Sequence, residues 1–158
     1  MPKKLTDEEY HKSLPKKQIG TAVLFFNSKR EILIVKPDYK ESWLVVGGSN
    51  DENESPLQCA IRETKEEIGL EISQMKLIGV YHSPKNGIHS DALKFIFDGG
   101  ELTDEQISQI KLQAGELTEY KFENPEKAIQ LFSNSLKNSI PQCLNAIKEN
   151  TCVYIDGV

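Results

Sequence analysis

Three glutamates within five residues are the strongest chemical signal in the chain. Glu63, Glu66 and Glu67 are spaced i, i+3 and i+4, so on a helix their carboxylates converge on one face. Like charges at these spacings each cost about 0.2–0.5 kcal/mol, and acidic residues near a helix C-terminus also oppose the helix dipole. Because clustered carboxylate oxygens suit hard cations, the spacing predicts a site for Mg²⁺, with Mn²⁺ as the alternative.

The residues around this cluster predict the helix that carries it. Ser55 is a typical N-cap, Pro56 suits the first helical position, and Gln58 completes a capping box. Gly69 is a typical residue to follow the C-terminus, so the predicted helix runs from Pro56 to Ile68. One stripe of the helix is expected to be buried, with the three glutamates on a separate face. The stripe consists of Leu57, Ala60, Ile61, Thr64 and Ile68.

The flanking residues make the acidic cluster specific. An isolated cluster of this kind is usually only a solvated helix face. Here the segment from Gly48 to Leu70 reads GSNDENESPLQCAIRETKEEIGL, which fills every position of the pattern G-x5-E-x7-R-E-U-x-E-E-x-G-U, where U is aliphatic or Thr. This pattern resembles the signature of the Nudix hydrolases. Val46 is a departure, because many relatives carry Pro at that position.

The resemblance implies roles for individual residues. It implies that the metal ligands are Glu63, Glu66, Glu67 and the main-chain carbonyl of Gly47. It also implies that Arg62 and Glu54 orient these carboxylates through charge-assisted hydrogen bonds. Two adjacent glycines would let the backbone approach the ion closely.

The implied reaction is the attack of water on a phosphorus atom in a nucleoside diphosphate that is linked to another moiety. A divalent cation would neutralise the diphosphate oxygens and acidify the water. The general base is expected to come either from the signature helix, as Glu63, or from a downstream loop, as Glu116 or Glu119. A surface carboxylate is more often simply solvated, so the last two assignments compete with that interpretation.

Substrate contacts are predicted from aromatic and basic residues in loops. Tyr39 and Lys85 are the candidates to stack on a base or to bind a phosphate. Trp43 is instead expected in the core, because it precedes an apolar run. Pro84 lies fifteen residues after Gly69, a spacing that in Nudix hydrolases is associated with ADP-ribose hydrolysis, although turn geometry explains it equally well.

Three functional hypotheses follow. The first is Mg²⁺-dependent hydrolysis of a nucleoside diphosphate derivative such as ADP-ribose or a nucleotide sugar. The second is a triphosphate pyrophosphohydrolase that removes oxidised nucleotides such as 8-oxo-dGTP and releases pyrophosphate. The third is a nucleotide-binding regulatory module without catalysis. Such a module would be expected to lose signature acids, whereas this chain retains all of them.

The remaining sequence predicts an α/β fold. Strands are expected at Gly20–Phe26, Glu31–Lys36, Trp43–Val46, Met75–His82, Ala92–Phe97, Leu117–Phe122 and Cys152–Ile155. A short helix is expected after Thr103, and a further helix from Pro125 that breaks near Pro141. Strands interleaved with helices favour a mixed sheet covered on both faces. The resemblance implies the same architecture, an α/β/α sandwich.

Composition is consistent with one catalytic domain. A chain of 158 residues with 38% hydrophobic content is long enough for one substantial core, expected at residues 18–158 after an N-terminal arm at residues 1–17. A net charge of -5 argues against a nucleic-acid polymer or a membrane surface as partner, but is compatible with a small phosphorylated nucleotide.

No targeting or membrane segment is visible, and three scattered cysteines suggest reduced thiols, so a cytoplasmic location is expected. The arm is expected either to be disordered or to pack across a partner subunit in a homodimer.

Overall fold

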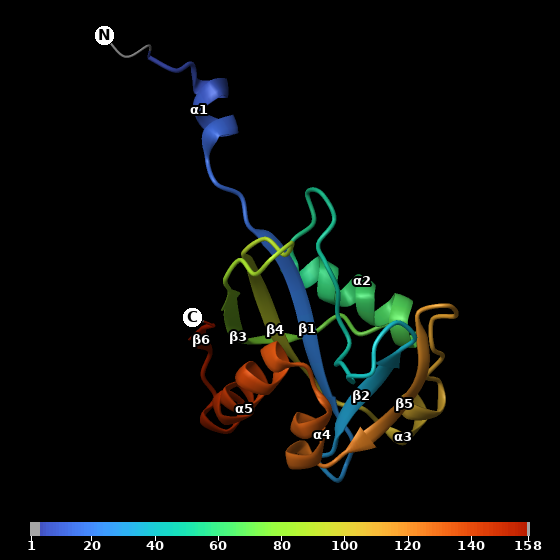
Figure 1. Ribbon diagram of the computed structural model, residues 1–158. Helices are drawn as coiled ribbons and strands as arrows, with labels where there is room; N and C mark the ends of the chain where they lie inside the picture. The colour runs from blue at the N-terminus through green and yellow to red at the C-terminus, as the bar shows by residue number, and fades with distance from the viewer. Residues whose placement is uncertain (1–3, 158) are drawn as a thin grey trace.

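A six-stranded mixed sheet organises residues 4–157, which are the part of the chain that the computed structural model describes (Figure 1). Its strands are β1 (Gln18–Phe26), β2 (Ile32–Pro37), β3 (Lys76–Ser83), β4 (Ala92–Glu101), β5 (Leu117–Glu123) and β6 (Val153–Asp156). The strand order is β5-β2-β1-β4-β3-β6. β1 is parallel to β4 and β3 to β6, whereas the other neighbouring pairs are antiparallel. The predicted α/β fold with a mixed sheet is therefore confirmed.

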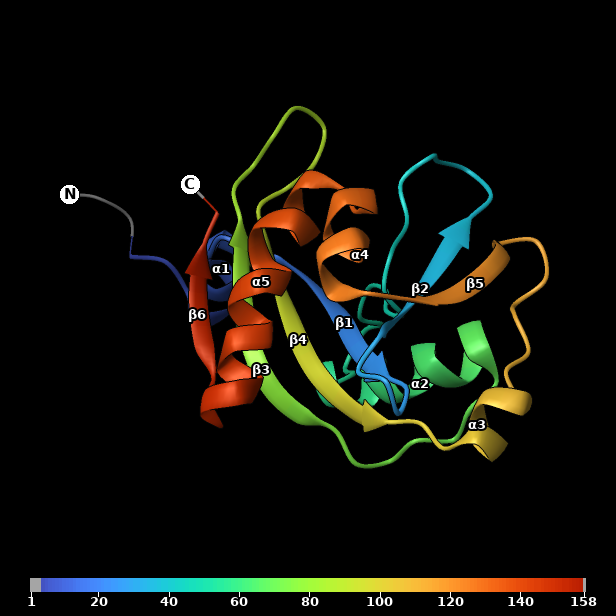
Figure 2. The same cartoon turned by 90° about the horizontal axis from the view of Figure 1, so that it is seen from below.

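Helices cover both faces of the sheet (Figure 2). The helices that lie against the sheet are α2 (Pro56–Ile68), α3 (Asp104–Ser108), α4 (Pro125–Leu131) and α5 (Asn134–Glu149), whereas α1 (Asp7–Ser13) belongs to the N-terminal arm. β1 alternates between two cores: Val23 and Phe25 pack in the core that contains residues of α2, whereas Leu24 packs in the core beneath α4 and α5. The sandwich predicted from the sequence is thus present. None of the helices within residues 4–157 has the length and apolar character needed to cross a membrane.

Helix α2 has the predicted ends and a different buried face. Ser55 and Gln58 form the capping box, with Gln58 N–H donating to Ser55 Oγ at 3.2 Å and Ser55 N–H to Gln58 Oε1 at 2.9 Å. Gly69 ends the helix with φ +74°. The predicted stripe was partly wrong, since the Leu57 side chain is 39% exposed and the carboxylate-bearing Glu67 is only 8% exposed. The residue buried beside the core stripe is therefore a glutamate.

The C-terminal helices differ from the prediction in where they break. The helix that begins at Pro125 ends at Leu131, and α5 runs without interruption through Pro141. An internal proline removes one backbone hydrogen bond of a helix. Here the neighbours Ile140 and Cys143 are fully buried against the sheet, and this packing holds the helix together across the defect.

Strands β1 and β2 separate soon after the hairpin that joins them, and residues 44–49 lie between them. Only Phe26 and Ile32 are paired in the register of the two strands. We call residues 44–49 the glycine segment. It is bonded on both sides by Leu44 N–H to Val35 O (2.9 Å), Val23 N–H to Val46 O (2.8 Å) and Thr21 N–H to Gly48 O (2.8 Å). The strand predicted at Trp43–Val46 thus exists only as isolated bridges, from Val46 to β1, from Leu44 to β2 and from Trp43 to Phe132.

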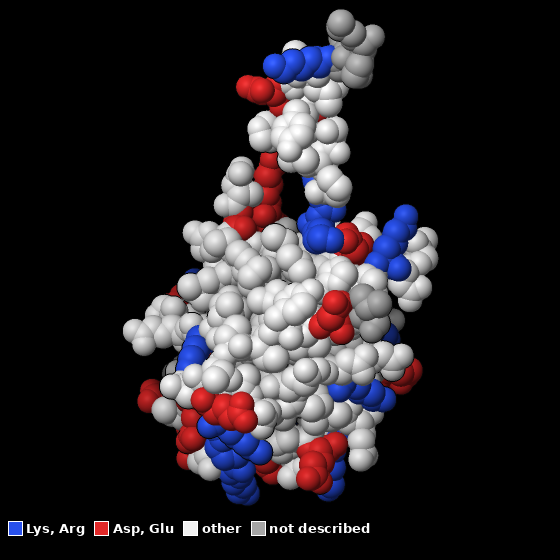
Figure 3. Space-filling view, turned by 90° about the vertical axis from the view of Figure 1, so that its left-hand side faces the viewer, with Lys and Arg blue, Asp and Glu red and all other residues white. Residues whose placement is uncertain are grey.

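The described part of the N-terminal arm projects from the body of the molecule (Figures 1 and 3). Its helix α1 has a complete capping box between Thr6 and Glu9 but buries none of its residues. At the base of the arm, Lys17 forms an ion pair with Asp91. The face shown in Figure 3 has a broad central area without acidic or basic residues. Residues 1–3 of the predicted arm lie outside the described residues.

We expect Gly47→Ala to destabilise the protein by several kcal/mol. Gly47 has φ +150°, and a Cβ atom there would lie 2.1 Å from the backbone oxygen of Thr21, which cannot move without opening the sheet. Gly100→Ala is the matched control, because Gly100 has φ +84° but open space around it. This variant should lose only the backbone strain of about 1 kcal/mol from its free energy of unfolding. Urea unfolding of both variants measures the difference. Equal losses in the two variants would contradict the close approach at Gly47.

Candidate functional site

Arg62 connects the acidic residues of the site. Its guanidinium donates to both carboxylate oxygens of Glu54, from Nε at 2.8 Å and from Nη2 at 2.9 Å. Nη1 donates to Glu63 Oε1 at 2.9 Å and to Glu66 Oε2 at 3.0 Å. Because the contact with Glu54 is bidentate, it fixes the plane of the guanidinium as well as its position.

The charges of this pair stabilise each other strongly. The hydrogen bond from Arg62, together with one from the backbone N–H of Asp51, lowers the pKa of Glu54 to about 2. The hydrogen bonds to Glu54 and Glu63 in turn raise the pKa of Arg62. Arg62 and Glu54 therefore form a charged pair, and the positioning role predicted for them stays a prediction.

The two glycines allow the backbone to approach the carboxylates closely. Gly47 N–H donates to Glu67 Oε2 at 2.9 Å. A Cβ atom at Gly48 would lie only 2.3 Å from Glu63 Oε1, so any larger residue would displace this carboxylate. At this contact, the glycine segment contributes main-chain atoms and α2 contributes the carboxylates of Glu63 and Glu67.

Burial places Glu67 in an unfavourable electrostatic environment. Loss of solvent raises its pKa to about 8, and the neighbouring charges of Glu63 and Glu116 add to this increase against the opposing effect of the Gly47 N–H. Burial also raises the pKa of Glu63. Arg62 forms ion pairs with Asp51, Glu54, Glu63 and Glu66, and the nearby Glu67 adds a further carboxylate. Such an excess of negative charge would be relieved by a divalent cation.

The carboxylates are engaged with protein groups in this arrangement. Within residues 4–157, no three His, Cys, Asp or Glu side chains are placed to hold a metal ion as they stand. Arg62 holds Glu63 and Glu66, while Glu67 accepts from Gly47. The donor set nevertheless fits a hard cation, because it consists of oxygen ligands and carries excess negative charge. Arg62 bonds only one oxygen of Glu63 and one of Glu66, so each keeps a second oxygen that could approach a cation after a side-chain adjustment.

The two downstream glutamates are placed differently. Glu116 immediately precedes β5, is exposed, and contributes to the raised pKa of both Glu63 and Glu67, so its charge faces the cluster. Glu119 lies within β5, where it pairs with Lys36. Among the described residues, Glu119 is not one of the largest influences on the pKa of Glu63 or Glu67.

The two predicted substrate contacts also lie in different places. Tyr39 is 70% exposed in the turn after β2. Its pKa is raised by partial burial and then by the charges of Glu67 and Glu116, so it borders the acidic cluster. Lys85 instead lies in the β3–β4 loop, beside Pro84 and Asp91 in a separate shallow hollow.

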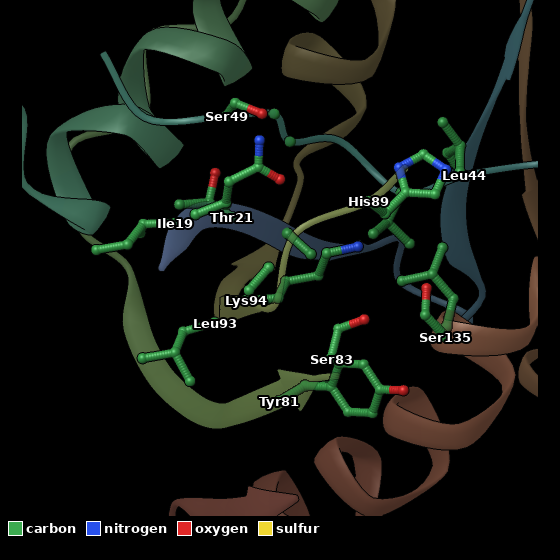
Figure 4. Close-up of a pocket in the computed structure, with 18 of the residues that line it drawn as sticks. Ile19, Thr21, Leu44, Ser49, Tyr81, Ser83, His89, Leu93, Lys94 and Ser135 are labelled. Atoms are coloured by element: carbon green, nitrogen blue, oxygen red, sulfur yellow. The ribbon is translucent and has the colours of Figure 1, made fainter. Parts of the chain in front are cut away.

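A cavity on the other side of the glycine segment was not predicted. It has a volume of about 330 Å³ and is lined by residues of β1, β3, β4 and α5 together with Gly47 and Gly48 (Figure 4). Lys94 extends into it from β4. One feature of the sequence points to this cavity. Lys94 lies between Ala92 and Ile96 in a predicted strand, at a position where alternation predicts an inward-facing residue. The sequence alone does not show that helices α4 and α5 leave this part of the sheet uncovered.

Comparison with known families gives one extensive match. The model of the NUDIX domain matches residues 16–143, which is most of the chain. The matched region begins within the predicted arm and includes the acidic cluster, the glycine segment, one core completely and most of the other.

Individual relatives match in sequence or in fold. A putative 8-oxo-dGTP diphosphatase of Bacillus subtilis is 38% identical over 66 residues, which are 42% of this chain and 44% of that protein. The MutT protein of Methanosarcina mazei superimposes with a TM-score of 0.68 at 23% identity, over 87% of this chain and 99% of the other. The NUDIX domain of Shewanella oneidensis NrtR, solved with ADP ribose, gives 0.70 at 14% identity, over 90% and 99%. The two structures are alike in fold, whereas the sequence match spans less than half of the diphosphatase.

We expect Glu67→Gln to stabilise the protein at pH 8 in EDTA. The pKa of Glu67 is raised from 4.5 to about 8, so its contribution to stability is present below pH 4.5 and is lost as pH rises through about 8. The loss is on the order of a few kcal/mol. Glutamine stays neutral and can still accept from Gly47, so thermal unfolding from pH 5 to 8 should show the wild type losing more stability than the variant. Parallel curves for the two proteins would contradict the burial of this charge.

Proposed function

This chain belongs to the Nudix family, whose hydrolases act on pyrophosphate bonds, and on that premise we propose that it hydrolyses the diphosphate linkage of a small nucleotide. The observation that carries the proposal is the buried Glu67 carboxylate, whose pKa is raised to about 8 beside Glu63 and the N–H of Gly47. A carboxylate is kept in this costly environment when it has a chemical task. The complete signature argues against a module that only binds nucleotides.

The metal in this proposal is Mg²⁺, with Mn²⁺ as the alternative, and Nudix hydrolases in general use divalent ions. The residues that would hold it are Glu63, Glu66, Glu67 and the carbonyl of Gly47. When bound, it would supply charge neutralisation of the diphosphate and acidification of the attacking water. Arg62 would remain fixed by Glu54 and limit the positions that Glu63 and Glu66 can adopt.

Glu116 is our proposed general base. It is solvent-exposed, so it can exchange protons with water, and its charge is felt by both Glu63 and Glu67. Glu63 is a poorer candidate, because it accepts a hydrogen bond from Arg62 and is also needed for the cation. Tyr39 borders the same region and is proposed to contact the substrate from the loop after β2.

The substrate is proposed to be a nucleoside diphosphate linked to another moiety, such as ADP-ribose or a nucleotide sugar. The cavity beyond Gly47 and Gly48 supports this choice, because it provides about 330 Å³ for a second group next to the acidic cluster. The alternative is a nucleoside triphosphate of the oxidised type, which the name of the Bacillus subtilis relative suggests. The first reaction leaves two phosphorylated products, whereas the second releases pyrophosphate.

We expect a substrate panel to separate these functions. Nucleoside diphosphate derivatives and triphosphates should be incubated with Mg²⁺, with EDTA, and with the Glu67→Gln variant, and the products resolved by chromatography. Activity should require Mg²⁺ and fall by about 100-fold or more in the variant, since the variant lacks a ligand of the cation. Lys127→Gln, on exposed surface of α4, is the control and should match the wild type. Turnover that survives EDTA would contradict the metal-dependent proposal.

We expect Glu116→Gln to lower kcat by at least about tenfold and Glu119→Gln to change it less than twofold, because only Glu116 faces the acidic cluster. Both variants should retain the wild-type melting temperature, because both side chains are exposed. If Glu116→Gln retains full turnover, Glu116 is not the base.

A further inference from the structure

The cavity beside the glycine segment has an unusual charge for this protein. The whole chain carries a net charge of -5, yet the residues that line the cavity include Lys40, Lys94 and His89 and no aspartate or glutamate. Hydroxyl groups of Ser83 and Ser135 point into the same space (Figure 4). The cavity therefore presents hydrogen-bond donors and positive charge.

Lys94 occupies a strand position that normally belongs to the core. It pairs with Gly20 of β1 and Tyr81 of β3, and its side chain lies on the same face of β4 as Ile96, which is fully buried beneath α5. Because Gly20 has no side chain, space remains above the sheet beside Lys94. An apolar residue at position 94 would extend the core.

The ammonium group of Lys94 lacks a compensating charge. Within residues 4–157, no carboxylate forms an ion pair with it, and the pKa of Lys94 is lowered first by burial and then by repulsion from Lys40. Holding a cation in such a place reduces stability. Nothing in the fold of the described residues requires a cation at this position, so an anion from outside is the natural partner.

Helix α5 adds to the positive potential. Its first turn contributes Ser135 and Leu136 to the cavity wall, and its N-cap residue Ser133 makes no side-chain capping hydrogen bond. The first N–H groups of a helix carry partial positive charge and favour negatively charged groups. The helix end and Lys94 thus favour the same kind of ligand from opposite walls.

The cavity and the proposed active site share the glycine segment as a common wall. Gly47 and Gly48 line the cavity, and the same two residues contact Glu67 and Glu63 on the side of α2. A substrate whose diphosphate lies at the carboxylates can therefore extend past the glycines towards Lys94.

We propose that Lys94 is a substrate-binding residue and that the cavity takes a part of the substrate, beyond the hydrolysed diphosphate, that carries a carboxylate or a further phosphate. This proposal rests on the proposed hydrolase function and narrows its substrate class. A neutral base or sugar would leave the Lys94 ammonium and the repulsion from Lys40 uncompensated. An anionic group would neutralise both and also accept from the surrounding hydroxyls.

Matched ligand pairs test this proposal. UDP-glucose and UDP-glucuronate differ by a carboxylate on the sugar, and dephospho-coenzyme A and coenzyme A differ by a phosphate on the nucleoside. Calorimetric titration with Mg²⁺ in the Glu67→Gln background, which prevents consumption of the ligand, should give at least about tenfold tighter binding of the charged member in one pair. Which pair responds tells whether the anion belongs to the attached moiety or to the nucleoside.

Variants of Lys94 make the test specific. In Lys94→Met, the charged member of the responding pair should bind less than about threefold more tightly than the uncharged member. Lys29→Met changes an exposed lysine in the β1–β2 turn and should keep the wild-type ratio of these two affinities. Lys94→Met should also melt at a higher temperature than its parent, because methionine fills the site without a half-buried charge. If Lys94→Met does not fold, Lys94→Gln takes its place in the same measurements.

Binding and hydrolysis fail in distinguishable ways. If the wild type hydrolyses nucleotides but no charged member is preferred, or if Lys94→Met keeps the preference, the proposal for Lys94 is wrong and the hydrolase function stands. If charged members bind through Lys94 but none of the panel is hydrolysed, the hydrolase function is wrong and the binding role stands. A lower melting temperature in both Lys94 variants, with the ratio unchanged, would make Lys94 a structural residue.

Discussion

The structure depends on how closely the backbone at Gly47 and Gly48 approaches its neighbours. Gly47 lies so near Thr21 that a Cβ atom would be 2.1 Å from a backbone oxygen, and Gly48 leaves room for the Glu63 carboxylate. The approach is possible because β1 and β2 separate after one residue pair, which lets the glycine segment bond to both strands. The sheet therefore fixes one wall of the active site, and α2 supplies the other.

Charge at this junction is arranged at the cost of stability, which the proposed ligands would offset. Glu67 is buried with a pKa raised to about 8, and Lys94 is placed on the opposite side with a lowered pKa and no carboxylate partner among the described residues. A direct contact between these opposite charges would stabilise the fold, but the glycine segment keeps them apart. Each charge then remains available, one for a cation and the other for an anion.

What could be predicted from the sequence is what local interactions decide. The ends of α2 follow from Ser55, Gln58 and Gly69, whose capping contacts involve residues of the same helix. The burial of Glu67 could not be predicted in this way, because it depends on Gly47, twenty residues away in sequence. Pro141 was expected to break a helix on local grounds, and packing of Ile140 and Cys143 against the sheet outweighs that preference. That Lys94 faces a cavity could not be predicted either, because it depends on which part of the sheet α5 leaves uncovered.

The family pattern identifies the acids, and the tertiary structure distinguishes residues that the pattern leaves equivalent. Glu116 and Glu119 are both acidic residues near one strand, but the strand pairs Glu119 with Lys36, while the charge of Glu116 reaches Glu63 and Glu67. Tyr39 and Lys85 were likewise similar as loop residues, yet only Tyr39 borders the acids. The reaction is therefore encoded in a contiguous segment, whereas substrate choice is encoded in side chains that only the sheet brings together. A shared signature helix therefore does not by itself fix the substrate, because the residues around the cavity belong to β4, α5 and loops outside that segment.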